Sequence, residues 1–162
     1  MNKIYLDYAA TTPVDDRVIE VMLPYIKEEF GNPSSLHGYG QKAEAALDTA
    51  RRSIADNLSA QPSEIIFTSC GSESDNLALR GIALARKEKF GFKQIVISPI
   101  EHPAVEATAE QLEKYFGFTV DFLPVNNQGE VEYKQVDSIL SDQTALVSIM
   151  GANNEIGTLN NL

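Results

Sequence analysis

The sequence predicts an α/β fold built around a largely parallel sheet. Helix-like and strand-like patterns alternate along the chain, an arrangement typical of parallel strands joined by helices. The chain has 162 residues, of which 43% are apolar, and this share is enough for a buried core. Short apolar runs bounded by turn residues predict strands at residues 65–68, 94–98, 118–123 and 145–150.

The segments between these strands show the apolar spacing of helices. Asp15 and Asp16 precede the first such pattern, which ends near residues 30–31 and contains Pro24, so a kink or an early break is expected there. A loop rich in Gly, Pro and Ser follows at residues 31–35. Further helices are predicted at residues 43–58, 77–89, 103–115 and 133–140.

The composition argues against nucleic acid and membranes as partners. Asp and Glu outnumber Lys and Arg by 23 to 13, and the resulting net charge of −10 repels phosphate groups. No apolar run approaches the ~18 residues of a membrane span, and the first residues lack the pattern of a secretory signal. Cys70 is the single cysteine, which suits a reducing compartment. We therefore expect a cytoplasmic protein.

The order of the elements predicts an unfinished domain. Residues 1–14 are expected to form an extended N-terminal arm, and residues 15–162 a partial domain. The last predicted strand is followed only by a loop, whereas an open parallel sheet needs helices on both faces and protection at its edges. We expect the chain to be part of a larger fold.

A turn of small residues at 68–74 follows the first predicted strand and precedes a helix. Gly71 lets a ligand approach the backbone, and the helix start offers free N–H groups, so this turn can cradle a phosphate. The alternative is an ordinary helix cap, with Ser72 or Ser69 as the N-cap residue. The turn matches neither a P-loop nor a dinucleotide fingerprint.

Two further polar segments follow the second and fourth predicted strands, where ligands of open α/β sheets bind. His102 precedes Pro103 at a helix start, where it can transfer protons or stack on a flat ligand; alternatively it is a capping or surface histidine. Asn153 and Asn154 can bond a ligand oxygen, or only shape a tight turn.

Other kinds of chemistry lack a supporting pattern. His37, His102 and Cys70 are too few and too scattered for a metal site. No Gly-x-Ser-x-Gly elbow is present. Cys70 could act as a nucleophile near a helix start, but a small residue that fits a crowded turn is the favoured interpretation.

Five blocks of sequence occur in a characteristic order: residues 5–13, residues 31–35 with His37, and residues 67–76, 101–105 and 147–157. In this order the chain resembles the cysteine desulfurases, which are pyridoxal-phosphate enzymes of the class V aminotransferase group. The resemblance implies the N-terminal half of the large domain of such enzymes, a three-layer α/β/α structure with a mainly parallel sheet.

The resemblance also implies a role for particular residues. Gly71 and Ser72 are similar to the pair that holds the cofactor phosphate. His102 resembles the histidine that stacks on the pyridine ring and assists proton transfer. Asn154 resembles the asparagine that hydrogen-bonds the ring oxygen of pyridoxal phosphate.

The chain departs from the family pattern in two respects. The family turn usually reads Ser-Gly-Ala-Thr, whereas this one reads Ser69-Cys70-Gly71-Ser72, and Cys70 does not match the family's catalytic cysteine. That cysteine, the Schiff-base lysine, and the aspartate and glutamine that contact the cofactor belong to later positions than Leu162. We therefore expect residues 1–162 alone to be catalytically inactive.

The activity implied by the resemblance is the conversion of L-cysteine to L-alanine. The sulfur passes to the enzyme as a persulfide, for iron–sulfur cluster or thio-cofactor biosynthesis. The implied partners are a chain carrying the second half or a homodimer partner, and a sulfur-acceptor protein. The alternatives are a selenocysteine lyase, another class V aminotransferase-fold enzyme, or an inactive truncated or split subunit.

Overall fold

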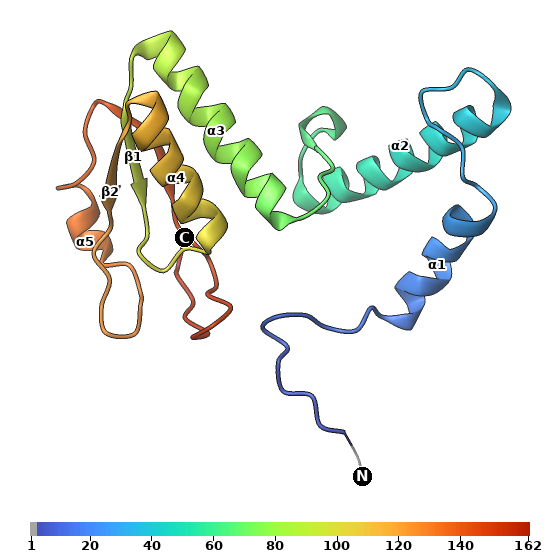
Figure 1. Cartoon of the computed structure of the whole chain (residues 1–162), viewed down its shortest axis with the longest axis horizontal. Helices are drawn as coiled ribbons and strands as arrows, with labels where there is room; N and C mark the ends of the chain where they lie inside the picture. Colours follow the sequence, from blue (N-terminus) through green and yellow to red (C-terminus); the bar gives the residue numbers. More distant parts are fainter. Residues whose placement is uncertain (1–2) are drawn as a thin grey trace. The chain divides into compact units, whose positions relative to one another are not determined.

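The computed structural model describes residues 3–162 and divides the chain into two compact units (Figure 1). The first unit is Met1–Phe67 and the second is Thr68–Leu162. Residues 1 and 2 of the predicted arm lie outside the described residues. Across residues 3–162, the helices are too short or too polar to cross a membrane.

The first unit begins with residues 3–15, in which neither helix nor strand occurs. Helix α1 (Asp16–Lys27) then starts where the sequence predicts it, because the Asp15 carboxylate accepts a hydrogen bond from the Arg17 backbone N–H and caps the helix. Pro24 does not end the helix, which continues to Lys27. Its side chains are all at least partly exposed.

Helix α2 (Gly38–Leu58) begins earlier than predicted because His37 caps it. The Nδ1 atom of His37 accepts a hydrogen bond from the Gly40 N–H at 3.4 Å. Gly40 is buried against the preceding loop, where an added Cβ would lie 2.1 Å from the backbone oxygen of Ser35. The helix ends at Ser59, whose left-handed backbone (φ 53°) stops the helical hydrogen bonding.

The predicted strand at residues 65–68 is wrong. The short 3-10 helix η1 (Pro62–Glu64) precedes this segment, and no strand pairs with it in the described part of the chain. Ile66 and Phe67 are 68% and 44% exposed, although their apolar character led to the prediction of a buried strand. A strand requires a partner for its backbone groups, and the local sequence does not report whether one is present.

The second unit contains helix α3 (Gly71–Phe90) and a parallel sheet of three strands in the order β2-β1-β3. After α3, the elements in chain order are β1 (Gln94–Ile97), α4 (Pro103–Phe116), β2 (Thr119–Phe122), α5 (Tyr133–Val136) and β3 (Thr144–Ser148). The predicted α/β architecture with parallel strands is confirmed. The predicted helix at residues 133–140 is shorter than expected, because only its first turn is helical and turns follow it.

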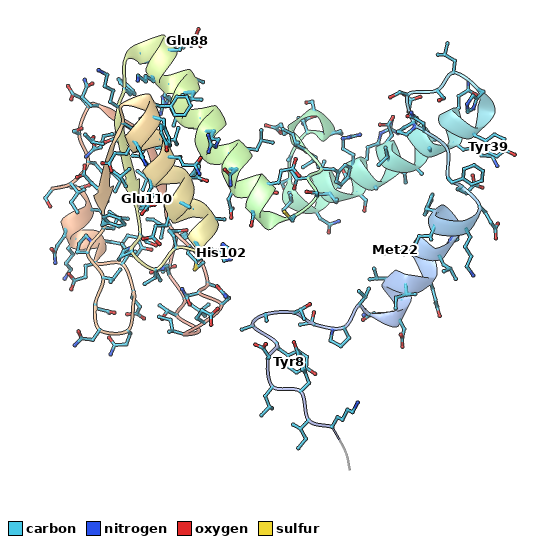
Figure 2. All side chains as sticks on the ribbon, in the orientation of Figure 1. Tyr8, Met22, Tyr39, Glu88, His102 and Glu110 are labelled. Carbon is cyan, nitrogen blue, oxygen red and sulfur yellow. The ribbon has the colours of Figure 1, made fainter. Side chains whose placement is uncertain are left out.

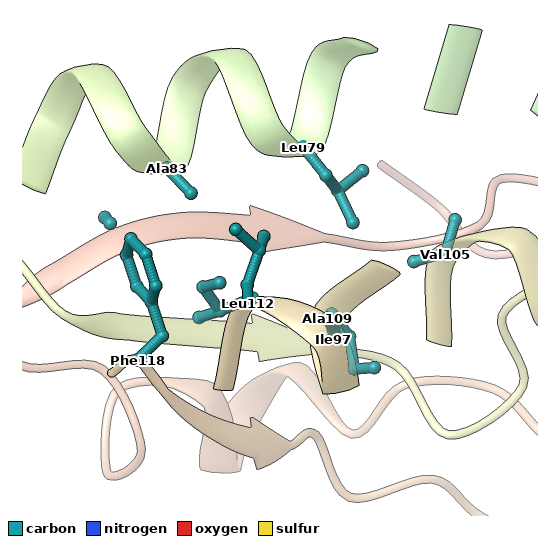
Figure 3. Close-up of a cluster of buried hydrophobic side chains, with 9 residues drawn as sticks. Leu79, Ala83, Ile97, Val105, Ala109, Leu112 and Phe118 are labelled. Atoms are coloured by element: carbon teal, nitrogen blue, oxygen red, sulfur yellow. The ribbon is translucent and has the colours of Figure 1, made fainter. Parts of the chain in front are cut away.

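The core forms where α3 and α4 cover one face of this sheet (Figure 3). Ile95 and Ile97 of β1 point to these helices, whereas Val96 points to the opposite face, as the two-residue period of a strand requires. The opposite face is covered by Leu123, Val131 and the α5 region. All three strand residues are at most 1% exposed, so β1 is the buried strand that its apolar run predicts.

Both covering helices start at the end of the unit where the strands finish (Figure 1). Their other ends are closed by Gly91 and Gly117, which have positive φ angles of 78° and 66°. The Lys87 ammonium donates to the carbonyl of Phe116 and so ties the two C-termini together. The helix starts lie at the carboxyl edge of the sheet, where ligands of such sheets bind.

Candidate functional site

The site residues predicted from the sequence all lie in the second unit and all are exposed. Gly71 and Ser72 are the first residues of α3, and His102 directly precedes α4 (Figure 2). Asn154 lies in the loop after β3. The His102 and Asn154 segments follow β1 and β3, as expected of a ligand site beyond the carboxyl ends of parallel strands, whereas in the described residues no strand precedes Gly71.

The start of α3 has no side-chain cap. Cys70 is the N-cap residue, with extended backbone angles, and its side chain makes no capping bond. The prediction of Ser69 or Ser72 as the N-cap is therefore wrong. Within residues 3–162, the backbone N–H groups of Gly71, Ser72 and Glu73 have no hydrogen-bond acceptor. An added Cβ at Gly71 would meet no atom within 4 Å, so this helix start is open to a ligand.

The turn that leads into α3 is held by its own side chains. The Glu73 carboxylate accepts hydrogen bonds from the Ser69 hydroxyl at 2.6 Å and the Ser69 backbone N–H at 2.7 Å. These two bonds lower the pKa of Glu73, the hydroxyl having the larger effect. The hydroxyls of Thr68 and Ser74 lie 2.6 Å apart and complete the network. The helix start is consequently preorganised, with the Glu73 carboxylate directed back toward Ser69.

His102 is itself the N-cap residue of α4. Its Nδ1 atom accepts a hydrogen bond from the Ala104 N–H at 3.1 Å, and Pro103 occupies the first helical position. His102 is therefore a capping histidine, as the alternative interpretation expected. The cap uses only the Nδ1 atom and leaves Nε2 and the faces of the ring unused. While Nδ1 accepts this bond, the proton of the neutral imidazole resides on Nε2, and the ring is exposed to a ligand.

The two asparagines after β3 have different surroundings. Asn153 is half-buried, and its Oδ1 atom accepts hydrogen bonds from the Glu155 and Ile156 N–H groups at 2.8 and 2.9 Å. It therefore shapes the turn. Asn154 is exposed, and among residues 3–162 its amide donates only to the neighbouring Glu155 side chain, at 2.9 Å. The second asparagine is thus the one available to a ligand.

One residue of this region was not predicted from the sequence. Glu101 joins the His102 loop to the loop after β3, because its Oε1 atom accepts a hydrogen bond from the Met150 N–H at 2.6 Å. The partners are 49 residues apart in the sequence. Its position next to His102 is the only signal in the sequence, and that signal does not indicate a contact with Met150.

The second unit brings the His102 and Asn154 segments together through such bonds, whereas His37 belongs to the first unit. Cys70 is exposed and forms no disulfide. In the part of the chain that the structure describes, no group of three or more His, Cys, Asp and Glu side chains is placed to hold a metal ion.

The chain is similar in sequence to cysteine desulfurases. It is 48% identical over 160 residues to "Cysteine desulfurase IscS" of Clostridium botulinum, covering 98% of this chain and 40% of the relative. It is 46% identical over 159 residues to "Cysteine desulfurase" of Trichormus azollae, covering 98% of this chain and 39% of that protein. The chain therefore spans about two fifths of the length of these relatives, and it matches their N-terminal part.

Solved structures of related proteins have the same fold. A protein described as NifS-like superposes with a TM-score of 0.87 at 42% identity, over 94% of this chain and 41% of its own. A structure titled "SspA in complex with cysteine" gives a TM-score of 0.87 at 42% identity, over 96% and 44%. The sequence profile of the family described as "Aminotransferase class-V" matches residues 4–162. By fold and by sequence, the chain belongs to the class V aminotransferase family.

Proposed function

We propose that this chain is the N-terminal portion of a cysteine desulfurase. The complete enzyme takes L-cysteine and a protein thiol and gives L-alanine and a persulfide on that thiol. The observation that carries this proposal is the uncapped start of α3, with its free N–H groups beside the open Gly71 position. The names of the relatives favour a desulfurase over a selenocysteine lyase or another class V enzyme.

Pyridoxal phosphate fits the residues at this helix start. The N–H groups of Gly71, Ser72 and Glu73 and the positive end of the helix dipole favour a phosphate dianion. The Ser72 hydroxyl makes no hydrogen bond within residues 3–162 and is free to donate. When bound, this cofactor supplies an electron sink for negative charge at the α-carbon of an amino acid.

His102 and Asn154 complete the proposed cofactor site. The exposed His102 ring offers a face for stacking, and its Nε2 atom is available for proton transfer to or from a ligand. The exposed Asn154 amide donates to a ligand oxygen once it turns from Glu155. In this assignment His102 is the catalytic residue of this portion, and Gly71, Ser72, His102 and Asn154 bind the cofactor.

The rest of the proposal concerns what surrounds this site. Residues 1–14 form an arm, and residues 15–162 form part of the cofactor-binding domain, which a second-half chain or a homodimer partner completes. The persulfide passes to a sulfur-acceptor protein for iron–sulfur cluster or thio-cofactor biosynthesis. The single cysteine and the net charge of −10 support a cytoplasmic protein without nucleic acid or membrane partners.

The proposal is tested by co-expressing this chain with the remaining segment of the Clostridium botulinum relative. We expect the pair to bind pyridoxal phosphate and to release alanine and sulfide from L-cysteine in the presence of a thiol. Ser72→Ala should weaken cofactor binding about ten- to a hundredfold, because a hydrogen bond to a charged oxygen contributes roughly 1.5–3 kcal/mol.

The matched control is Ser53→Ala on the exposed surface of α2, which should leave the affinity unchanged. A well-folded pair that binds no pyridoxal phosphate contradicts the proposed function. If the pair binds the cofactor and Ser72→Ala leaves the affinity unchanged, only the assignment of Ser72 to the cofactor site is contradicted.

A further inference from the structure

The loop that contains His102 and the loop that contains Asn154 are joined by two side chains, each of which directly precedes one of these proposed cofactor-binding residues. Glu101 precedes His102, and Asn153 precedes Asn154. We propose that Glu101 and Asn153 are positioning residues, which fix His102 and Asn154 relative to each other. This inference rests on the proposed function only for the identity of the ligand that His102 and Asn154 contact.

Glu101 extends the pairing of two strands beyond their last ladder residues. The Ser98 N–H donates to the Ser148 carbonyl at 3.0 Å, and within residues 3–162 this is the last backbone hydrogen bond between the two chain segments. The Glu101 Oε1 atom then accepts from the Met150 N–H at 2.6 Å and from the Ser98 hydroxyl at 2.8 Å. Ser98 is only 1% exposed, so the carboxylate is anchored on the core and reaches across to the other loop.

Asn153 makes the reciprocal connection. Its Nδ2 atom donates to the Ile100 carbonyl at 2.8 Å, while its Oδ1 atom holds the turn of its own loop. One side chain from each loop therefore bonds the backbone of the other. In both bonds the donor belongs to the loop after β3 and the acceptor to the His102 loop, so a displacement of one loop relative to the other strains both bonds.

These bonds leave the neighbouring residues free. Within residues 3–162 the His102 side chain bonds only the Ala104 N–H of its own helix, and the Asn154 side chain bonds only Glu155, so neither side chain holds the two loops together. In each loop, the first residue of the pair (Glu101 or Asn153) therefore binds the other loop, and the second (His102 or Asn154) is exposed to solvent. A ligand that contacts both exposed residues gains from this arrangement, because their separation is set before binding.

A separate contact that does not involve Glu101 also holds the second loop. The Asn160 side chain donates to the Met150 carbonyl at 2.8 Å and accepts from the Val131 N–H at 2.9 Å. Substitution of Glu101 therefore removes one of the two bonds to the His102 loop without removing this anchor. The Glu101 variants are consequently suited to test positioning rather than folding.

The first measurement needs no ligand and uses the 162-residue chain. In Glu101→Ala we expect hydrogen exchange of the Met150 amide to rise at least tenfold, and the backbone order parameters of His102 and Asn154 to fall. Glu101→Gln keeps an acceptor oxygen and should retain most of both values. Glu106→Ala, on the exposed surface of α4, is the matched control. Unchanged exchange and order in Glu101→Ala overturn the proposal.

Asn153→Asp tests the reciprocal bond, because it keeps the Oδ1 acceptor and removes the Nδ2 donor. We expect the order parameter of His102 to fall while the turn at Glu155 and Ile156 stays protected from exchange. If His102 keeps its order in this variant, Asn153 is only a turn residue and its part of the proposal fails.

The second measurement is the affinity for pyridoxal phosphate of the co-expressed enzyme. Glu101→Ala should weaken it about tenfold, and Glu101→Gln should restore most of the loss. A parent enzyme that binds no cofactor contradicts the proposed function, and the exchange and order measurements still decide the positioning roles. Loosened loops with unchanged affinity in a binding parent overturn the positioning roles alone.

Discussion

At the scale of single residues, His102 caps a helix with one ring atom and leaves the other ring nitrogen for the proposed chemistry. Its Nδ1 atom caps α4, while the remainder of the ring is exposed at the carboxyl edge of the sheet. A substitution that removes the whole side chain therefore affects both stability and the proposed chemistry. The two effects can be separated because asparagine is a good N-cap residue but has no imidazole.

We expect His102→Asn and His102→Ala to differ in stability but not in turnover. The alanine variant loses the cap and should lose about 1 kcal/mol of unfolding free energy, whereas the asparagine variant should stay close to the parent. Turnover in the co-expressed enzyme should fall roughly 10²–10⁴-fold in both, because neither has a group that transfers protons. Denaturant titration and steady-state kinetics measure the two effects. Full turnover in His102→Asn contradicts a catalytic role.

Glu73 gives a prediction for the dependence of stability on pH. The Ser69 hydroxyl and N–H hold the pKa of Glu73 below its ordinary value, so its contribution is present at neutral pH and is lost as the pH falls through the lowered pKa. We expect Glu73→Gln to lower the melting temperature at pH 7, with a difference from the parent that shrinks in acid.

The control for this series is Glu88→Gln, an exposed residue of α3 without a side-chain hydrogen bond within residues 3–162. Melting temperatures of the parent and both variants between pH 7 and pH 3 give the comparison. A difference between parent and Glu73→Gln that grows in acid contradicts the assigned pKa direction.

At the scale of elements, the start of α2 depends on a close approach between helix and loop. Gly31 and Gly40 face backbone atoms across this contact, and a Cβ on either would lie 2.1 Å from a carbonyl oxygen. Backbone atoms cannot move aside as a flexible side chain does. Glycine is therefore required here for space, although Gly40 has no positive φ angle.

Two glycines of the same helix make a matched pair. Gly40→Ala should destabilise the chain by about 1–3 kcal/mol, because the added methyl forces the loop at Ser35 away from the helix. Gly38→Ala meets no atom within 4 Å and should change stability by less than about 1 kcal/mol, toward higher stability. Chemical denaturation followed by circular dichroism measures both. Equal stability of the two variants contradicts the close approach.

At the scale of the whole chain, the positions of the lysines bear on activity. Lys87 and Lys89 lie in the last turn of α3, Lys114 lies in the last turn of α4, and Lys93 precedes β1. These residues belong to the end of the second unit opposite to the helix starts at Gly71 and His102. None of the four can reach a ligand bound at those helix starts.

We expect the 162-residue chain alone to release neither alanine nor sulfide from L-cysteine, even with excess pyridoxal phosphate. The co-expressed second segment should restore both products, because it brings the lysine and the cysteine that the resemblance assigns to the later part of such enzymes. Amino-acid analysis and a sulfide assay measure the outcome. Product release by the chain alone contradicts this expectation and directs the search to its own lysines and Cys70.

Local patterns in the sequence were sufficient for most of the elements and for the candidate residues. Caps and periodicity define α1 and α4, and periodicity without a side-chain cap indicates α3, because these signals act over a few neighbouring residues. The apolar run of β1 likewise predicts a buried strand. Gly71, Ser72, His102 and Asn154 were found because they occur in recognisable motifs after predicted strands, and their roles remain predictions.

The tertiary structure alone decided which segments pair and which polar groups remain free. Residues 65–68 have the composition of a strand but no partner, and Cys70 rather than a serine begins α3, which leaves its N–H groups open. Glu101 and Asn153 bond backbone groups 49 and 53 residues away. Hydrogen bonds between distant segments depend on how the chain folds back on itself, and a local sequence pattern contains no information about that distance.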